Sequence, residues 1–331
     1  MTPRDRVLGA LRGEKVDRVP ASSVTQVGIV QAMEQIGATW PAGHSDPEQM
    51  VKIGVSLYKL AGLETARIPF CLTVQAEAMG CKVNIGTIDR QPSIAEHPTT
   101  PADQITVPPD FLSRGRIPAV IKGTELLKQY PDLPKMVGIE GPLTLAGHLV
   151  GIEKLMLMTI KQRDAVVKVV DTCTKANIEF TKAILDAGAE VFVISDPSAS
   201  PELMSPRDFA SIVKPKLREL AHIVTNKGAI GVLHICGGVL KIIKDMAETE
   251  FETLSIEEKA DVATAKATIG PKPTLVGNVS AARTLFSGTP EAVKAEAQRA
   301  VAAGIDVLGP GCGIAPRSPL DNVKALVSAV M

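Results

Sequence analysis

Hydrophobic and polar positions along the chain repeat in one order: an amphipathic helix, a small turn with glycine, and a short β-branched run. Three segments show this order: 184–196, 224–238 and 300–311. Each contains a glycine (Gly188, Gly228 or Gly304) where a helix C-terminus favours a left-handed residue, and an apolar run follows directly. The pattern therefore predicts repeated helix–strand units.

The helix before the first of these runs has a clear buried face, since its apolar residues step by three and four positions. These residues are Val166, Val169, Cys173, Ala176, Phe180 and Ala183. A buried cysteine without a partner is usually a small apolar filler, and we interpret Cys173 in this way. Cys71 and Cys81 are ambiguous, and neither is predicted to bind a metal.

Eight apolar runs are predicted to form strands. They are residues 18–23, 66–71, 136–141, 190–196, 231–236, 253–256, 274–279 and 306–309. Most are separated by helical stretches, which is typical of a parallel sheet with crossover helices. Eight such units favour a closed (β/α)8 TIM barrel over an open doubly wound sheet, and no dinucleotide-binding fingerprint follows the first run.

The domain organisation predicted from the sequence is a single barrel over residues 1–331 with an N-terminal helical extension. Residues 91–118 interrupt the pattern with six prolines, and we expect them to form an insertion between the second and third strands. No low-complexity tract or linker divides the chain.

Composition excludes several classes of protein. Lys+Arg and Asp+Glu are both 36, and aromatic residues are 3%, which argues against nucleic-acid binding. No apolar run reaches the roughly 20 residues of a membrane span, and the charged N-terminus lacks the apolar region of a signal peptide. The five cysteines are scattered and do not indicate a disulfide framework. We expect a soluble cytoplasmic protein.

Candidate metal ligands follow three of the predicted strands. His234 and Cys236 end the fifth run, Glu257 follows the sixth, and Cys312 lies in a Gly-Pro-rich loop after the eighth. Active sites of (β/α)8 barrels lie at the C-terminal ends of the strands. Residues 234 and 236 share one face of an extended strand, and imidazole with thiolate sulfur is typical of zinc.

The sequence resembles the methylcobamide:coenzyme M methyltransferases of methanogenic archaea, which belong to the uroporphyrinogen decarboxylase superfamily of (β/α)8 barrels. The similarity covers nearly the whole chain and is clearest in the segments RIPFCLTVQAEAMGC, IEGPLTLAGHLVG, LHICGGV, LSIEEKAD and LGPGCGIAPRSPLDNVKAL. The resemblance implies that His234, Cys236, Cys312 and Glu257 bind zinc, with Glu258 as the alternative to its neighbour.

The resemblance also implies the reaction: a methyl group passes from a methyl-Co(III) corrinoid on a separate protein to the thiol of coenzyme M (2-mercaptoethanesulfonate). The product is methyl-coenzyme M, in methanogenesis from methanol or methylamines. One Zn²⁺ per chain would deprotonate the thiol, whose free pKa is about 8.5. The identity of the corrinoid protein and the oligomeric state stay open.

Four further residues are candidates for binding substrate. We expect Ser198 and Ser200 at a helix N-terminus, and Asn278 in a turn, to donate hydrogen bonds to the sulfonate. The serines could equally cap that helix. Asp196 could orient the histidine ligand from behind or contact the corrinoid.

Three alternatives remain at this stage. A porphyrinogen decarboxylase has the same fold but needs no metal, and nothing in it would require Cys236 and Cys312. A corrinoid methyltransferase with another acceptor is a second alternative. A zinc-stabilised scaffold is the third, although structural zinc ligands normally cluster in short loops.

Overall fold

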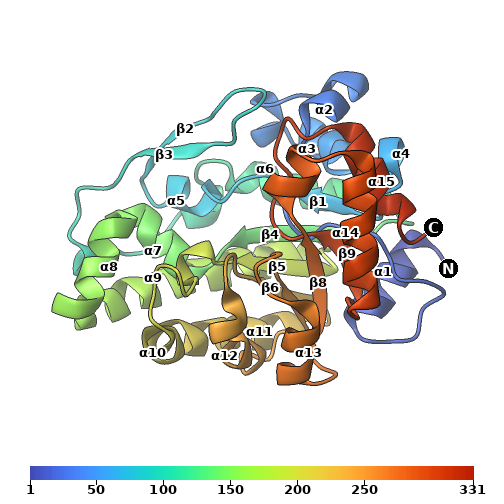
Figure 1. Cartoon of the computed structure of the whole chain (residues 1–331). Coiled ribbons are helices and arrows are strands. Elements are labelled where there is room, and N and C mark those ends of the chain that lie inside the picture. The colour runs from blue at the N-terminus through green and yellow to red at the C-terminus, as the bar shows by residue number, and fades with distance from the viewer.

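The core of the protein is one parallel sheet of seven strands, in the order β1–β4–β5–β6–β7–β8–β9 (Figure 1). The computed structural model describes all residues 1–331. The strands are β1 (Ala66–Ile68), β4 (Lys135–Glu140), β5 (Val191–Ser195), β6 (Ile230–His234), β7 (Thr253–Ser255), β8 (Thr274–Val279) and β9 (Val307–Pro310). Every neighbouring pair is parallel, so all seven C-terminal ends lie at one edge. The predicted parallel α/β sheet is confirmed.

The eighth predicted strand, residues 18–23, is the exception. Ala21 makes a single parallel bridge to Leu308 of β9. On its other side, its carbonyl accepts a 2.8 Å hydrogen bond from the amide of Glu64, just before β1. Extending the ladder in either direction would need the amide hydrogen of Pro20 or Pro310, and proline has none. The regular sheet therefore has seven strands and is curled, whereas the sequence predicts an eight-stranded barrel.

Helices connect the strands and flank the sheet (Figure 1). They are α1 (Pro3–Leu11), α2 (Val30–Ile36), α3 (Pro47–Gly54), α4 (Ser56–Ala61), α5 (Val74–Ala78), α6 (Ile117–Leu126), α7 (Pro142–Val150), α8 (Ile152–Lys161), α9 (Arg163–Asp186), α10 (Pro206–Asp208), α11 (Lys214–Asn226), α12 (Ile243–Ala247), α13 (Val262–Ile269), α14 (Pro290–Ala302) and α15 (Leu320–Ser328). Gly188, Gly228 and Gly304 all have positive φ after their helices, as predicted. Cys173 is fully buried on α9, which confirms its core position.

The interior of the curled sheet is closed at the end where the strands begin. Alternate residues of the strands, such as Val193 and Val232, pack in one cluster with Leu11 and its neighbours on α1. Thr253 and Thr274 fix this helix, because their hydroxyls donate to the Leu11 carbonyl at 3.0 and 2.8 Å. Access to the interior is therefore from the C-terminal ends of the strands.

The proline-rich segment 91–118 lies between β1 and β4, the second and third of the predicted runs. It contains β3 (Ser93–Glu96), which pairs with β2 (Lys82–Asn84) in an antiparallel hairpin that the sequence did not predict. Two 3-10 turns follow, at Ala102–Gln104 and Phe111–Ser113. The single-domain organisation stays a prediction.

No single helix combines the length and apolar character needed to cross a membrane. The one pair of helices that meets the criteria together, α7 with α8, is bent by 103° at the break between them. The predicted cytoplasmic location is not tested by this observation.

The role of α1 in closing the interior of the sheet, where the strands begin, can be tested with Leu11→Ala. Leu11 is fully buried, so its truncation should leave a cavity and lower the free energy of unfolding by about 2–5 kcal/mol in denaturant titrations. Leu157→Ala is the matched control, since Leu157 is 59% exposed and its loss should change stability by about 0.5 kcal/mol at most. Equal changes in the free energy of unfolding for the two substitutions would contradict this role of α1.

Candidate metal centre

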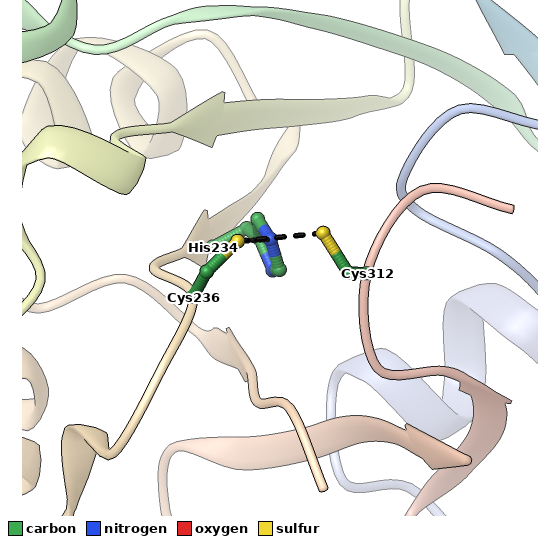
Figure 2. Close-up of side chains that lie close together, drawn as sticks. All are labelled: His234, Cys236 and Cys312. Atoms are coloured by element: carbon green, nitrogen blue, oxygen red, sulfur yellow. Dashed lines mark hydrogen bonds between the residues drawn. The ribbon is translucent and has the colours of Figure 1, made fainter. Parts of the chain in front are cut away.

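Three side chains from two distant segments converge at the C-terminal end of the sheet. His234 is the last residue of β6, Cys236 lies two residues further on, and Cys312 is in the loop after β9. The sulfur atoms of Cys236 and Cys312 are 3.4 Å apart, and His234 Nε2 lies 3.0 Å from the Cys236 sulfur. Figure 2 shows the two thiols pointing toward each other beside the imidazole ring. One ligand atom from each residue lies within 4.8 Å of the others.

The orientation of His234 is set by the neighbouring strand. In the parallel register His234 pairs with Ser255 of β7, and parallel partners point to the same face. The Ser255 hydroxyl lies 3.0 Å from His234 Nδ1, which leaves Nε2 to face Cys236. Such partners of a ligand's second nitrogen fix its tautomer and orientation. Ser255 was not among the predicted site residues, although it lies near the end of the adjacent apolar run 253–256.

The two thiols influence each other's ionisation because they are close and mostly buried. The hydrogen bond from Cys236 lowers the pKa of Cys312, and His234 adds to this effect. The same hydrogen bond raises the pKa of Cys236, and burial raises it further. Of the two thiols, Cys312 is therefore the more readily ionised.

The donor set fits a zinc ion in its chemistry and its spacing. Tetrahedral zinc with its usual bond lengths places two sulfurs about 3.8 Å apart and a sulfur about 3.5 Å from a nitrogen. The observed separations of 3.4 and 3.0 Å are only a few tenths of an ångström shorter. Three protein ligands, rather than four, are typical of a catalytic site with an open position. These residues could therefore hold a metal ion.

Glu257 lies next to this group but is not part of it. Its Oε2 accepts a 2.7 Å hydrogen bond from the amide of Gly237, the residue after Cys236, and its Oε1 lies 3.7 Å from the Lys259 ammonium. Glu258 faces elsewhere, because its Oε1 accepts a 2.7 Å hydrogen bond from Ser280. Of the two candidates, Glu257 is thus the one held beside a sulfur ligand.

A cavity of about 210 Å³ opens beside the ligand group. Much of its lining is apolar, with Pro69, Phe70 and Leu72 following β1. The remaining lining residues are Thr25, Gln26, Arg67, Cys71, Gln91, Ser195, Pro197, His234, Cys236, Cys312 and Gly313. The cavity therefore presents the two sulfurs and the imidazole to a small molecule in a largely apolar space.

None of the four residues predicted to bind substrate lines this cavity; these are Asp196, Ser198, Ser200 and Asn278. Asp196 instead caps α7, accepting hydrogen bonds from the Thr144 amide and hydroxyl at 2.7 Å each and from the Leu143 amide at 3.2 Å. Burial raises its pKa to about 6, although these hydrogen bonds act in the opposite direction. The side chain near the ring of His234 is Ser255, so Asp196 does not orient the histidine.

The helix N-terminus predicted at Ser198 and Ser200 is absent. Residues Pro197–Ala199 form a 3-10 turn, and the next helix begins only at Pro206, capped by Ser205. The Ser200 hydroxyl accepts a hydrogen bond from the amide of Glu202 instead. Asn278 donates its amide to the Ala260 carbonyl at 3.0 Å. Ser200 and Asn278 thus have local structural partners, whereas Ser198 is held only by its backbone amide, which donates to the Thr144 hydroxyl at 3.1 Å.

Comparison with known proteins gives end-to-end matches. The family model for uroporphyrinogen decarboxylase (URO-D) matches residues 2–331. A methylcobamide:CoM methyltransferase, MtaA, from Methanosarcina barkeri is 47% identical, covering 99% of this chain and 97% of that protein. MtbA from Methanosarcina mazei, also a methylcobamide:CoM methyltransferase, is 32% identical, with 98% and 96% covered. The solved structure of a methyltransferase from Methanosarcina mazei matches with a TM-score of 0.95 at 47% identity, covering 99% of this chain and 98% of that one.

The metal centre predicts different outcomes for different cysteines. Cys236→Ala and Cys312→Ala each remove a thiolate, so purified protein should lose most of its bound metal, measured by elemental analysis. Cys173→Ala is the matched control: it removes a thiol that is fully buried on α9, and it should lower stability without changing metal content. Normal metal content in both Cys236→Ala and Cys312→Ala would rule out the site.

Proposed function

The chain belongs to the uroporphyrinogen decarboxylase family, and within this family we propose that it transfers a methyl group from a methylated corrinoid protein to coenzyme M. The observation that carries this proposal is the group of one imidazole and two thiols facing a small cavity at the open end of the sheet. The product is methyl-coenzyme M, the compound formed in methanogenesis from methanol or methylamines.

We assign Zn²⁺ as the metal, one per chain, held by His234, Cys236 and Cys312. When bound, it would supply Lewis acidity that lowers the pKa of the coenzyme M thiol. Ser255 holds the ring of His234 in place through Nδ1. We propose Glu257 as a fourth, displaceable ligand, and its hydrogen bond to Gly237 beside Cys236 supports this role.

The proposed reaction is a nucleophilic substitution at the methyl carbon. The thiol of coenzyme M loses its proton, its sulfur forms a bond to the methyl carbon, and the carbon–cobalt bond breaks. The electron pair of that bond stays on cobalt, which leaves as Co(I) with its own protein. The apolar side chains of Phe70 and Leu72 in the cavity lining would limit hydration of the reacting sulfur, which favours attack by the thiolate.

The donor protein is proposed to dock over the open end of the sheet, because the closed end is filled by α1. Gln91, at the start of the proline-rich insertion, reaches the cavity lining, which supports a place for residues 91–118 in the rim around this end of the sheet. The bridge from Ala21 to Leu308 supports a barrel in which residues 20–23 take the eighth position.

The cavity disfavours the alternatives. Pockets for drug-sized ligands measure about 300–1,000 Å³, so about 210 Å³ is too small to enclose a porphyrinogen. A decarboxylase would also leave the paired sulfurs of Cys236 and Cys312 without a purpose. A structural zinc site would not face a cavity.

A spectroscopic assay tests the proposed function. Zinc-loaded protein mixed with methylcob(III)alamin and coenzyme M should convert the methyl-Co(III) spectrum to that of Co(I), with methyl-coenzyme M formed in equal amount. The controls omit coenzyme M or replace the protein by Cys312→Ala, and both should leave the spectrum unchanged. Absence of methyl transfer by the zinc-loaded wild-type protein, whether methylcob(III)alamin or a methylated corrinoid protein is the donor, would overturn the proposal.

A second test concerns the two adjacent carboxylates. Glu257→Gln should keep most of the zinc, because two thiolates and an imidazole remain, and should leave methyl transfer measurable. Glu258→Gln is the matched control and should change neither, since Glu258 bonds to Ser280 instead. If Glu257→Gln removes zinc as completely as Cys312→Ala, the carboxylate is an obligate ligand. If only Glu258→Gln affects zinc, the wrong member of the pair has been assigned.

A further inference from the structure

Arg67 on β1 is a buried cation without an acidic partner. Its side chain is only 3% exposed, and no carboxylate lies within ion-pair distance of it. Its hydrogen bonds go to backbone carbonyls instead: Nε donates to Val24 at 2.7 Å, and Nη1 donates to Ile68 and Pro69. Burying an unpaired charge is costly, so such a group calls for an anion.

The position of Arg67 relative to the sulfur ligands is fixed through two consecutive residues. Arg67 Nε donates to the Val24 carbonyl, and the hydroxyl of the next residue, Thr25, donates to the Cys312 carbonyl at 3.0 Å. Arg67, Cys236 and Cys312 all line the same cavity of about 210 Å³. A cation and the two thiols of the candidate metal centre thus line one small cavity, and two consecutive residues connect them.

The fold makes room for this guanidinium. Gly138 on β4 lies beside it, and a methyl group at that position would overlap Nη2. Nη2 makes no hydrogen bond within the protein, and neither does the hydroxyl of Ser195, which also lines the cavity. Arg67 remains charged at neutral pH, because burial lowers its pKa only to about 9. Arg67 and Ser195 therefore both line the cavity, and each has a donor without a protein acceptor.

We infer that Arg67 binds the sulfonate of coenzyme M and thereby directs the thiol to the metal ligands, with the Ser195 hydroxyl as a second donor. This inference rests on the proposed function, since it names the contacts of that substrate. Arginine suits the task because its planar donors match an oxyanion with several oxygens. The anion would neutralise the only unpaired charge in the cavity, while its thiol end reaches Cys236 and Cys312.

The inference predicts a specific loss of substrate discrimination. In Arg67→Met, kcat/KM for coenzyme M should fall about 10- to 100-fold, the range for a hydrogen bond to a charged group. The same variant should methylate 2-mercaptoethanol, which lacks the sulfonate, at the wild-type rate. Zinc content should be unchanged, since no metal ligand is altered. Arg116→Lys is the control and should keep the wild-type preference for coenzyme M. Arg116 is also buried, but it pairs with Glu77 and does not line the cavity.

Two further measurements keep the test decisive if Arg67→Met does not fold. Gly138→Ala leaves Arg67 in the chain but displaces its guanidinium, so the preference for coenzyme M over 2-mercaptoethanol should again fall. In the wild-type protein, ethanesulfonate should compete with coenzyme M, whereas propanol of similar size should not. Retention of the wild-type preference in Arg67→Met or Gly138→Ala, or no competition by ethanesulfonate, would overturn the inference. Wild-type protein that methylates no thiol would instead contradict the proposed function.

Discussion

The parallel register of β5, β6 and β7 is the constraint on which the site depends. Ser195 pairs with His234, and His234 pairs with Ser255, so three polar side chains stand at one level inside the curled sheet. Directly below them, Val193 and Val232 belong to the apolar interior. A shift of one residue would turn His234 outward and bring Leu233 in, because side chains alternate between the two faces of a strand. The hydrogen bond between Ser255 and His234 Nδ1 is available only in this register.

The sulfur ligands and Arg67 line the same cavity, and each needs a partner of opposite charge. Two cysteines 3.4 Å apart cannot both ionise easily without a cation, and Arg67 cannot remain buried comfortably without an anion. No carboxylate lines the cavity to neutralise either group. The proposed metal ion at the sulfurs and the proposed anionic substrate at the arginine would resolve both imbalances. The apolar residues Pro69, Phe70 and Leu72 line the same cavity.

The positions of the strands could be predicted from the sequence more completely than the side-chain contacts inside the sheet. Seven of the eight runs form strands, because β-branched patterning and helix-ending glycines such as Gly188 are local signals. The convergence of Cys312 with the H-x-C pair could also be predicted, since parallel strands end at one edge. Arg67 was missed because a charged residue inside an apolar run gives no sign of whether it faces inward. The helix N-terminus predicted at Ser198 does not form, because Pro197 starts a 3-10 turn that does not continue into an α-helix.

The irregular eighth position of the sheet is part of how the site is formed. Pro20 limits the pairing of residues 20–23 with β9 on its N-terminal side and Pro310 limits it on its C-terminal side, so neither the chain after Ser22 nor the loop after Pro310 continues this ladder. On one side, Thr25 is then free to bond the Cys312 carbonyl by its hydroxyl. On the other, the loop after Pro310 bends inward and carries Cys312 to 3.4 Å from Cys236. A regular eighth strand would hold both segments in the plane of the sheet, and the second thiolate would not reach the first.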